Sequence, residues 1–181
     1  MNIYDALHKD HEKLHGLLDD LVHAAQSDHE KCKGLVDQIR DELVPHSRAE
    51  EAVFYNAIRE LNMDKGIVVN SYAEHAKAEA DLRTLQVMKE VDINSVALAK
   101  QLRKDVLHHI KDEENKVFTV AKKLFTFEEA KMIGKAFSQL KPTVKDQSFI
   151  GTSLDLIANL LPPRLMEGFR RTFMGKEKRS A

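Results

Sequence analysis

The feature of this sequence that most suggests chemistry is a histidine followed four positions later by a glutamate, which occurs three times. The pairs are His46 and Glu50, His75 and Glu79, and His109 and Glu113. In a helix, residues four positions apart lie one turn apart on the same face. If that face is apolar, an imidazole and a carboxylate are buried together, which is unfavourable unless each group has a partner. We therefore expect the three pairs to face one another around metal.

Apolar residues surround these pairs at helical spacing, so the pairs are predicted to lie on buried stripes. The stripe of the third pair continues through Leu102, Val106 and Val117. Near the N-terminus, His11 occupies the same kind of position among regularly spaced leucines. Iron, manganese and zinc accept imidazole nitrogen and carboxylate oxygen as ligands, and a carboxylate with two oxygens can bridge two cations. The sequence therefore predicts a site for a pair of metal ions. Its candidate ligands are His11, His46, Glu50, His75, Glu79, His109 and Glu113.

The charge balance of this set is favourable for metal. Three buried carboxylates offset much of the charge of two divalent cations, whereas the same carboxylates are costly to bury together without a cation. The stability of the protein is therefore expected to depend partly on metal.

Four amphipathic helices are predicted to carry the ligands, which makes the fold all-α. They are expected over about 3–25, 30–61, 67–90 and 95–125. Helices of this length with short connections imply an up-down-up-down four-helix bundle. Pro45 removes a backbone hydrogen bond from the second helix, so a kink or a break is expected beside His46. Asn94 or Ser95 is the expected N-cap of the fourth helix.

The chain beyond residue 125 is predicted to be a short helical C-terminal segment. Thr126 and Glu129 are spaced as a capping box, and the helix that they begin is expected to end before Pro142. The further segments expected are a linker (141–152) and two short helices (154–161 and 164–174).

The predicted domain division is a metal-binding bundle over 1–125 and an extension over 126–181. The extension ends in a basic segment with Leu165, Met166 and Phe169 at helical spacing. This apolar face is expected to cover the bundle or to form a homodimer contact, in preference to binding a membrane surface or another protein partner.

Composition excludes several classes of protein. Hydrophobic residues make up 43% of the 181 residues and charged residues 31%, which is enough apolar material for a core and argues against disorder. The formal net charge of −1 gives no electrostatic footprint of a nucleic-acid binder. A single cysteine, Cys32, excludes an internal disulfide. With no secretory signal and no apolar run of the roughly 20 residues that a membrane span needs, we expect a cytoplasmic protein.

At four places the sequence resembles the hemerythrin-like family, also called the HHE cation-binding domain. The resembling motifs are Asp10-His11, His46 and Glu50-Glu51 followed by Val53-Phe54, Glu74-His75, and His109 and Glu113-Glu114 followed by Val117-Phe118. They cover roughly residues 3 to 125. The resemblance implies a four-helix bundle with a non-haem di-iron centre. It also implies that Glu50 and Glu113 bridge the irons, and that the terminal ligands are His11, His46, His75 and His109.

The motifs differ from those of oxygen-carrying hemerythrins in two respects. Those proteins place the last carboxylate five residues after its histidine, a spacing that His108 and Glu113 satisfy, but His109 is the preferred ligand because it lies on the apolar stripe. They also have two histidines one turn apart on the third helix, and here the second position is Glu79. A more anionic site argues against simple reversible oxygen carriage and favours reaction with O2, peroxide or NO in a stress response or in sensing. Peroxide decomposition is possible chemistry, but no residue commits the chain to turnover. Iron storage or delivery, including repair of iron–sulfur clusters, is the alternative, and additional ligation by His15 or His108 is left open.

Overall fold

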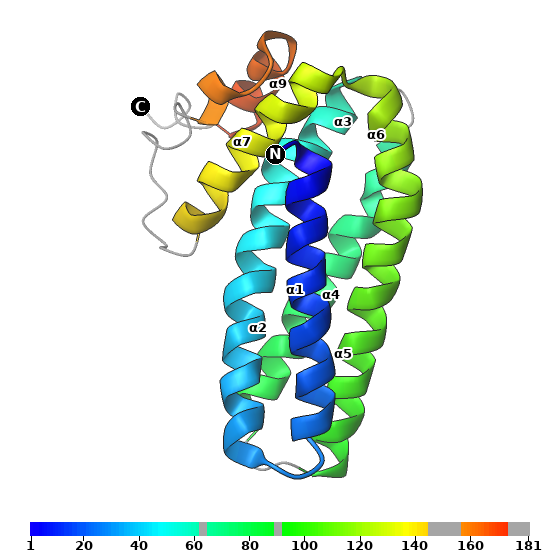
Figure 1. Cartoon of the computed structure of the whole chain (residues 1–181), viewed down its shortest axis with the longest axis vertical. Helices are drawn as coiled ribbons and strands as arrows, with labels where there is room; N and C mark the ends of the chain where they lie inside the picture. Colours follow the sequence, from blue (N-terminus) through cyan, green and yellow to red (C-terminus); the bar gives the residue numbers. More distant parts are fainter. Residues whose placement is uncertain (62–64, 89–91, 145–156, 174–181) are drawn as a thin grey trace, which may run out of the picture.

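The computed structural model describes residues 1–61, 65–88, 92–144 and 157–173, and every regular element among them is helical. The elements are α1 (Ile3–Ala24), α2 (His29–Glu50), η1 (Glu51–Tyr55), α3 (Asn56–Leu61), η2 (Lys65–Val68), α4 (Val69–Val87), α5 (Ile93–Asp112), η3 (Glu113–Val117), α6 (Phe118–Leu124), α7 (Phe127–Val144) and α9 (Pro163–Phe173). Four long helical rods lie side by side and alternate in direction (Figure 1). They are α1, α2 to α3, η2 to α4, and α5 to α6. The predicted all-α bundle with additional C-terminal helices is confirmed.

Local hydrogen bonds explain where several helices begin. At the start of α1, the side chain of Asn2 accepts a hydrogen bond from the backbone of Asp5, whose carboxylate accepts one from the backbone of Asn2. The predicted capping box at Thr126 and Glu129 is confirmed, since each side chain accepts a hydrogen bond from the backbone N–H of the other. The predicted N-cap of α5 was wrong, because the side chain of Asp92 accepts the first backbone hydrogen bonds.

Two π-helical turns interrupt the rods at equivalent places. Helix α2 runs through Pro45 without a break and ends at Glu50, where the turn η1 begins at the next residue. The second turn, η3, begins at Glu113. The predicted break at Pro45 is therefore absent, and the first irregular turn begins six residues later, at Glu51. A π turn holds one residue more than an α turn and is frequent at functional sites. Both turns lie next to a candidate ligand.

The bundle core is divided into two apolar clusters, and buried polar residues lie between them. One cluster contains Leu14, Leu43, Leu82 and Val106. The other contains the buried apolar residues at the opposite end of the bundle, together with those of α7 and α9 that pack there. On each of the four rods, a candidate histidine lies where the stripe passes from one cluster to the other. The apolar residues above and below exclude water from this layer.

The C-terminal helices pack on the end of the bundle that carries the N-terminus (Figure 1). Helix α7 crosses α1 and α2, and its Gly134 comes so close to the backbone of Asn2 and Ile3 that a Cβ atom would meet the carbonyl carbon of Asn2 at 2.6 Å. Helix α7 continues through Pro142 to Val144, so the predicted end before Pro142 was wrong.

Helix α9 packs on α3 and closes the apolar cluster at that end. Its residues Leu165 and Phe169 are buried in that cluster, so this apolar face packs against the bundle. Residues 157–160 of the predicted helix over 154–161 are helical, and 154–156 lie outside the described residues, as does most of the predicted linker. None of the described helices is long and apolar enough to cross a membrane.

Candidate metal centre

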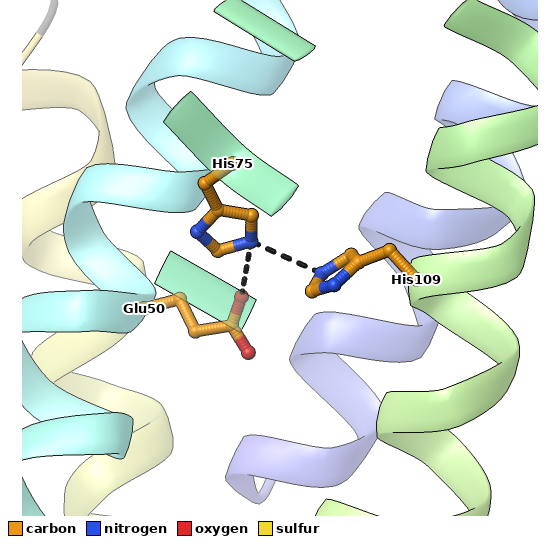
Figure 2. Close-up of side chains that lie close together, drawn as sticks. All are labelled: Glu50, His75 and His109. Atoms are coloured by element: carbon orange, nitrogen blue, oxygen red, sulfur yellow. Dashed lines mark hydrogen bonds and ion pairs between the residues drawn. The ribbon is translucent and has the colours of Figure 1, made fainter. Parts of the chain in front are cut away.

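Glu50, His75 and His109 place three donor groups together in the middle of the bundle (Figure 2). The Nε2 atoms of His75 and His109 are 3.0 Å apart, and Nε2 of His75 is 3.6 Å from Oε2 of Glu50. One donor atom from each residue lies within 4.8 Å of the others, and all three residues are buried. These distances suit a single cation bound by two imidazoles and a carboxylate.

A second group of donors lies beside the first, on α1, α2 and the start of η3. Nε2 of His11 is 3.2 Å from Oε2 of Glu113, and the rings of His11 and His46 are 5.1 Å apart. Oε2 of Glu50 is 3.5 Å from Nε2 of His46, so Glu50 contacts one histidine of each group. The structure thus brings together six of the seven candidate ligands: His11, His46, Glu50, His75, His109 and Glu113.

Each histidine of the site donates its Nδ1–H to a carboxylate on its outer side. The pairs are His11 with Glu114 (2.9 Å), His46 with Asp10 (3.2 Å), His75 with Glu51 (2.9 Å) and His109 with Glu74 (2.9 Å). With Nδ1 bonded on the outer side, Nε2 is the ring nitrogen directed inward, where it can bind a metal. A carboxylate behind an imidazole is the usual support of a metal-bound histidine, because it fixes the tautomer and the orientation of the ring.

The inward-facing oxygens are buried without hydrogen bonds. Both carboxylate oxygens of Glu50 and both of Glu113 lack a hydrogen-bond partner, as does Nε2 of His11. Both glutamates are at most 1% exposed. An unpaired buried carboxylate is strongly unfavourable, and a cation is the partner that satisfies several such oxygens at once. The residues present therefore fit a metal centre.

Burial and neighbouring charges set the protonation of the histidines. Burial lowers the pKa of His46 to about 4 and also lowers the pKa of His75, so both imidazoles are neutral near pH 7. Burial would lower the pKa of His11 as well. Its hydrogen bond to Glu114 and its proximity to Glu113 outweigh this effect and raise the pKa to about 9. A metal at His11 would therefore displace a proton.

The two inner glutamates have pKa values that move in opposite directions. Burial and the adjacent charge of Glu113 raise the pKa of Glu50 well above its usual value. Burial opposes ionisation of Glu113 too, but its close contacts with Glu50 and with His11, whose Nε2 lies 3.2 Å from Oε2, prevail and lower its pKa. Of the two carboxyls, Glu50 is therefore the one that ionises less readily, and a bound cation would favour the ionised form of both.

Glu79 lies apart from the other six candidates. Its Oε2 atom is 2.8 Å from Nη2 of Arg48 and 3.6 Å from Nη2 of Arg83. It lines a pocket between α2 and α4 that also contains Val44, Leu82 and Arg83. The sequence predicted that the Glu79 carboxylate binds metal, whereas in the structure it pairs with Arg48.

The other histidines considered as additional ligands are exposed. His15 is 3.7 Å from Asp19 and His108 is 3.8 Å from Asp112, in both cases within one helical turn on the surface. His109, not His108, therefore occupies the site on α5.

Tyr55 is a residue of the site that the sequence did not reveal. It is fully buried, its ring stacks on His75 with centroids 5.7 Å apart and planes at 15°, and its hydroxyl makes no hydrogen bond. Burial and the charges of Glu113 and Glu50 raise its pKa well above the usual value. Tyr55 lies in the π turn η1, and a π turn leaves no signal in helical periodicity.

Comparison with known families agrees with this geometry. The family model of the hemerythrin HHE cation binding domain matches residues 2–121. The chain therefore belongs to the hemerythrin HHE cation-binding domain family, which confirms the resemblance inferred from its motifs.

One solved structure extends the comparison beyond the bundle. The crystal structure of a hemerythrin HHE cation binding domain-containing protein from Mycobacterium kansasii matches with a TM-score of 0.69 at 18% sequence identity. The match covers 93% of this chain and 99% of that chain, so it includes C-terminal helices as well as the bundle. At this identity the likeness shows the fold alone. Comparison with curated proteins gives no match.

Proposed function

We propose that this protein holds two non-haem iron ions and uses them to bind, or to react with, a small ligand such as O2, peroxide or NO. The ligands in this proposal are His11, His46, Glu50, His75, His109 and Glu113. The observation that carries it is the set of four unpaired oxygens on Glu50 and Glu113, buried among four inward-facing imidazoles. Manganese and zinc accept the same donors, and iron is the member of this group that makes the site redox-active.

The two glutamates are the proposed bridging ligands. Glu50 contacts a histidine of each group, and Glu113 contacts His11 while its charge acts on His75 as well. The four histidines provide terminal nitrogen ligands whose orientation the outer carboxylates maintain. Bound iron would supply the electron transfer and Lewis acidity that the side chains lack.

The surrounding protein keeps this chemistry away from bulk water. Phe118 stacks on His11 with centroids 6.5 Å apart, and Tyr55 stacks on His75. With all six ligands at most 5% exposed, iron held here would exchange slowly. Slow exchange favours a resident cofactor over iron that is stored for release. Iron storage or delivery is therefore the alternative function. A cytoplasmic location, a role in stress response or sensing, and a homodimer remain predictions.

A ligand-mixing experiment tests this function. The iron-loaded, reduced protein is mixed separately with O2, hydrogen peroxide and NO, and the absorption spectrum is followed by stopped flow. A spectral change specific to at least one ligand is expected. Sustained peroxide loss would identify an enzyme, whereas saturable binding without turnover would identify a sensor. Rapid transfer of all iron to a chelator, with no response to any of the three ligands, would contradict the proposal and favour iron storage or delivery.

A further inference from the structure

The two halves of the bundle are related by an approximate two-fold repetition around the site. Asp10 and His11 on α1 correspond to Glu74 and His75 on α4, with the same shift in residue number. His46 and Glu50 on α2 correspond in the same way to His109 and Glu113 on α5 and η3. The hydrogen bonds repeat as well, since His46 donates to Asp10 and His109 donates to Glu74. Differences between the halves therefore show where they have distinct roles.

The first difference lies in the side chains packed on the ligands. His11 stacks on Phe118 at an interplanar angle of 18°, and the corresponding pair is His75 on Tyr55 at 15°. Leu7, one turn before His11, is likewise replaced by Ser71, one turn before His75. One half thus presents two apolar side chains where the other presents two buried hydroxyls. The hydroxyl of Tyr55 has no hydrogen-bond partner, although Ser71, Glu50 and Glu113 are near enough to influence its pKa.

The second difference is the cover that α7 provides for one half. Lys141 of α7 pairs with Asp10 at 2.8 Å, Phe137 lies edge-on to His46 with ring centroids 5.8 Å apart, and Gly134 lies against the backbone of Ile3. Figure 1 shows α7 on the side of α1 and α2 and away from α4 and α5. The face formed by α1 and α2 is therefore closed over the site.

The equivalent face on α4 and α5 contains an open pocket of about 210 Å³. Its lining includes Ile67 and Glu74, the counterparts of the Ile3 and Asp10 that α7 covers, together with Asn70, Ser71 and Glu113. Glu113 is 1% exposed and Ser71 is 5% exposed, so the pocket extends from the surface to an inner ligand of the site. Ser71 lines this pocket, and the hydroxyl of Tyr55 is close enough to Ser71 and Glu113 for both to act on it.

The charges of this pocket favour an uncharged ligand. Lys116 at its rim is neutralised by Asp112 at 2.7 Å, and the remaining ionisable groups of the lining are the carboxyls of Glu74 and Glu113. An anion would meet net negative charge on this path.

A larger pocket of about 320 Å³ between α1 and α5 also borders a proposed metal ligand, His11, but on the side of the ring that faces away from the metal site. It reaches His11 at the edge that carries Nδ1, where the Oε1 atom of Glu114 accepts hydrogen bonds from both His8 and His11. A molecule there would contact the outer carboxylate and would still be separated from the inner oxygens by the ring.

We propose that a small uncharged ligand enters through the pocket between α4 and α5, and that Tyr55 and Ser71 hydrogen-bond to it beside His75 and His109. The inference rests on the proposed function, because it assigns the ligand of that function to one half of the site. Tyr55 donates its O–H, and Ser71 either donates or accepts. The covered half, with Phe118 and Leu7 in place of Tyr55 and Ser71, retains its metal ligands but lacks these two hydroxyls.

Nitric oxide is a suitable probe, and its association and dissociation rates with the iron-loaded, reduced protein separate entry from retention. Asn70→Trp adds bulk to an exposed residue at the pocket rim, and slower association and dissociation with an unchanged ratio are expected. Its matched control is Glu12→Trp, which adds the same bulk to the α1–α5 pocket and should leave both rates unchanged.

Tyr55→Phe tests the hydrogen bond. Loss of one hydrogen bond of ordinary strength should raise the dissociation rate by about two- to tenfold, with little change in association. Tyr4→Phe is the matched control, since Tyr4 also has a buried, unpaired hydroxyl but packs on Phe118 in the covered half. Iron content is measured in every variant, so that loss of metal is not mistaken for loss of ligand.

Four outcomes would overturn the inference. Slower association in Glu12→Trp but not in Asn70→Trp would place entry on the α1–α5 side. Equal dissociation rates in wild type and Tyr55→Phe would show that Tyr55 does not hydrogen-bond to the ligand. If wild type holds no iron or does not bind nitric oxide, the proposed function fails, and the inference fails with it. If wild type binds nitric oxide normally and the rates of Asn70→Trp and Tyr55→Phe are unchanged, the inference alone fails.

Discussion

Nζ of Lys141 lies 2.8 Å from Oδ2 of Asp10, the same oxygen that accepts the Nδ1–H of His46 at 3.2 Å. The C-terminal extension thus supports a carboxylate that orients a proposed metal ligand. Removing this support in Lys141→Met should weaken metal binding. The effect should be several-fold and below the roughly 10–100-fold cost of losing the outer carboxylate itself. Competition with a chromophoric chelator measures it.

Lys13→Met is the matched control for this effect. Lys13 pairs with Glu42, the second carboxylate that Lys141 contacts, at the surface between α1 and α2. Metal affinity in Lys13→Met should equal that of wild type. Equal losses in the two variants would instead indicate a general effect of removing positive charge, and α7 would have no specific influence on the site.

Gly134 determines how closely α7 approaches α1. In Gly134→Ala the new Cβ atom would lie 2.6 Å from the carbonyl carbon of Asn2 and 2.7 Å from the backbone nitrogen of Ile3. Because backbone atoms cannot move aside without shifting a helix, a loss of about 1–3 kcal/mol in the free energy of unfolding is expected. Urea denaturation followed by circular dichroism measures this loss.

Gly34→Ala is expected to raise stability, in contrast to the loss expected for Gly134→Ala. Gly34 is exposed within α2, and a Cβ atom there meets nothing within 4 Å. Higher helix propensity should therefore stabilise the protein by roughly 0.5–1 kcal/mol. If both alanine variants shift stability in the same direction, close packing at Gly134 is not the deciding factor.

Glu79 should be dispensable for metal binding. Because its carboxylate pairs with Arg48 at 2.8 Å, Glu79→Gln is expected to keep the full metal content, with a loss of less than about 1 kcal/mol in stability since Arg48 is half exposed. Metal content per chain and urea denaturation check the two parts. Loss of a metal ion in this variant would return Glu79 to the ligand set predicted from sequence.

The ion pair between Glu129 and Arg164 should make the attachment of α9 sensitive to acid. Hydrogen bonds from Arg164 lower the pKa of Glu129 to about 2, below the unfolded value of roughly 4.3. The pair therefore contributes fully to stability above the unfolded pKa and loses its contribution as the pH falls toward about 2. The expected contribution is at most about 1 kcal/mol, because the pair lies at the surface.

Glu129→Gln isolates this charge, since glutamine can keep the capping contact with Thr126. The difference in free energy of unfolding between wild type and variant should be constant above about pH 5 and shrink as the carboxylate of the wild type is protonated. Glu128→Gln, at a more exposed residue paired with Lys131, should show a smaller difference. A difference for Glu129→Gln that persists unchanged at pH 2 would contradict the assignment.

Helical periodicity was sufficient to predict the four rods and the layer of the site. His11, His46, His75 and His109 each interrupt a regular apolar stripe, and a stripe is a property of the sequence alone. Proximity between rods follows from the bundle, so six of the seven predicted ligands come together. The outer carboxylates also leave a signal in retrospect, because each one directly follows or precedes a ligand in the chain.

The remaining features depend on geometry that periodicity does not contain. The π turns after Glu50 and at Glu113 change which side chains face inward, and this change brings Tyr55 to the site. The carboxylate of Glu79 is on the expected face, but it pairs with the long side chain of Arg48 from the neighbouring helix α2. Helix α7 continues past Pro142 because a proline inside a helix removes only one hydrogen bond when packing on α1 and α2 supports the remainder.

The measurement that tests the central claim most directly is the metal content of the folded protein. Mass spectrometry of wild type, Glu113→Gln and His15→Gln after reconstitution with iron should give close to two irons per chain in wild type and in His15→Gln. Substantial loss is expected in Glu113→Gln, because one proposed bridging oxygen is replaced by an amide nitrogen. A folded wild type without metal, or a full iron complement in Glu113→Gln, would contradict a di-iron centre bridged by Glu113.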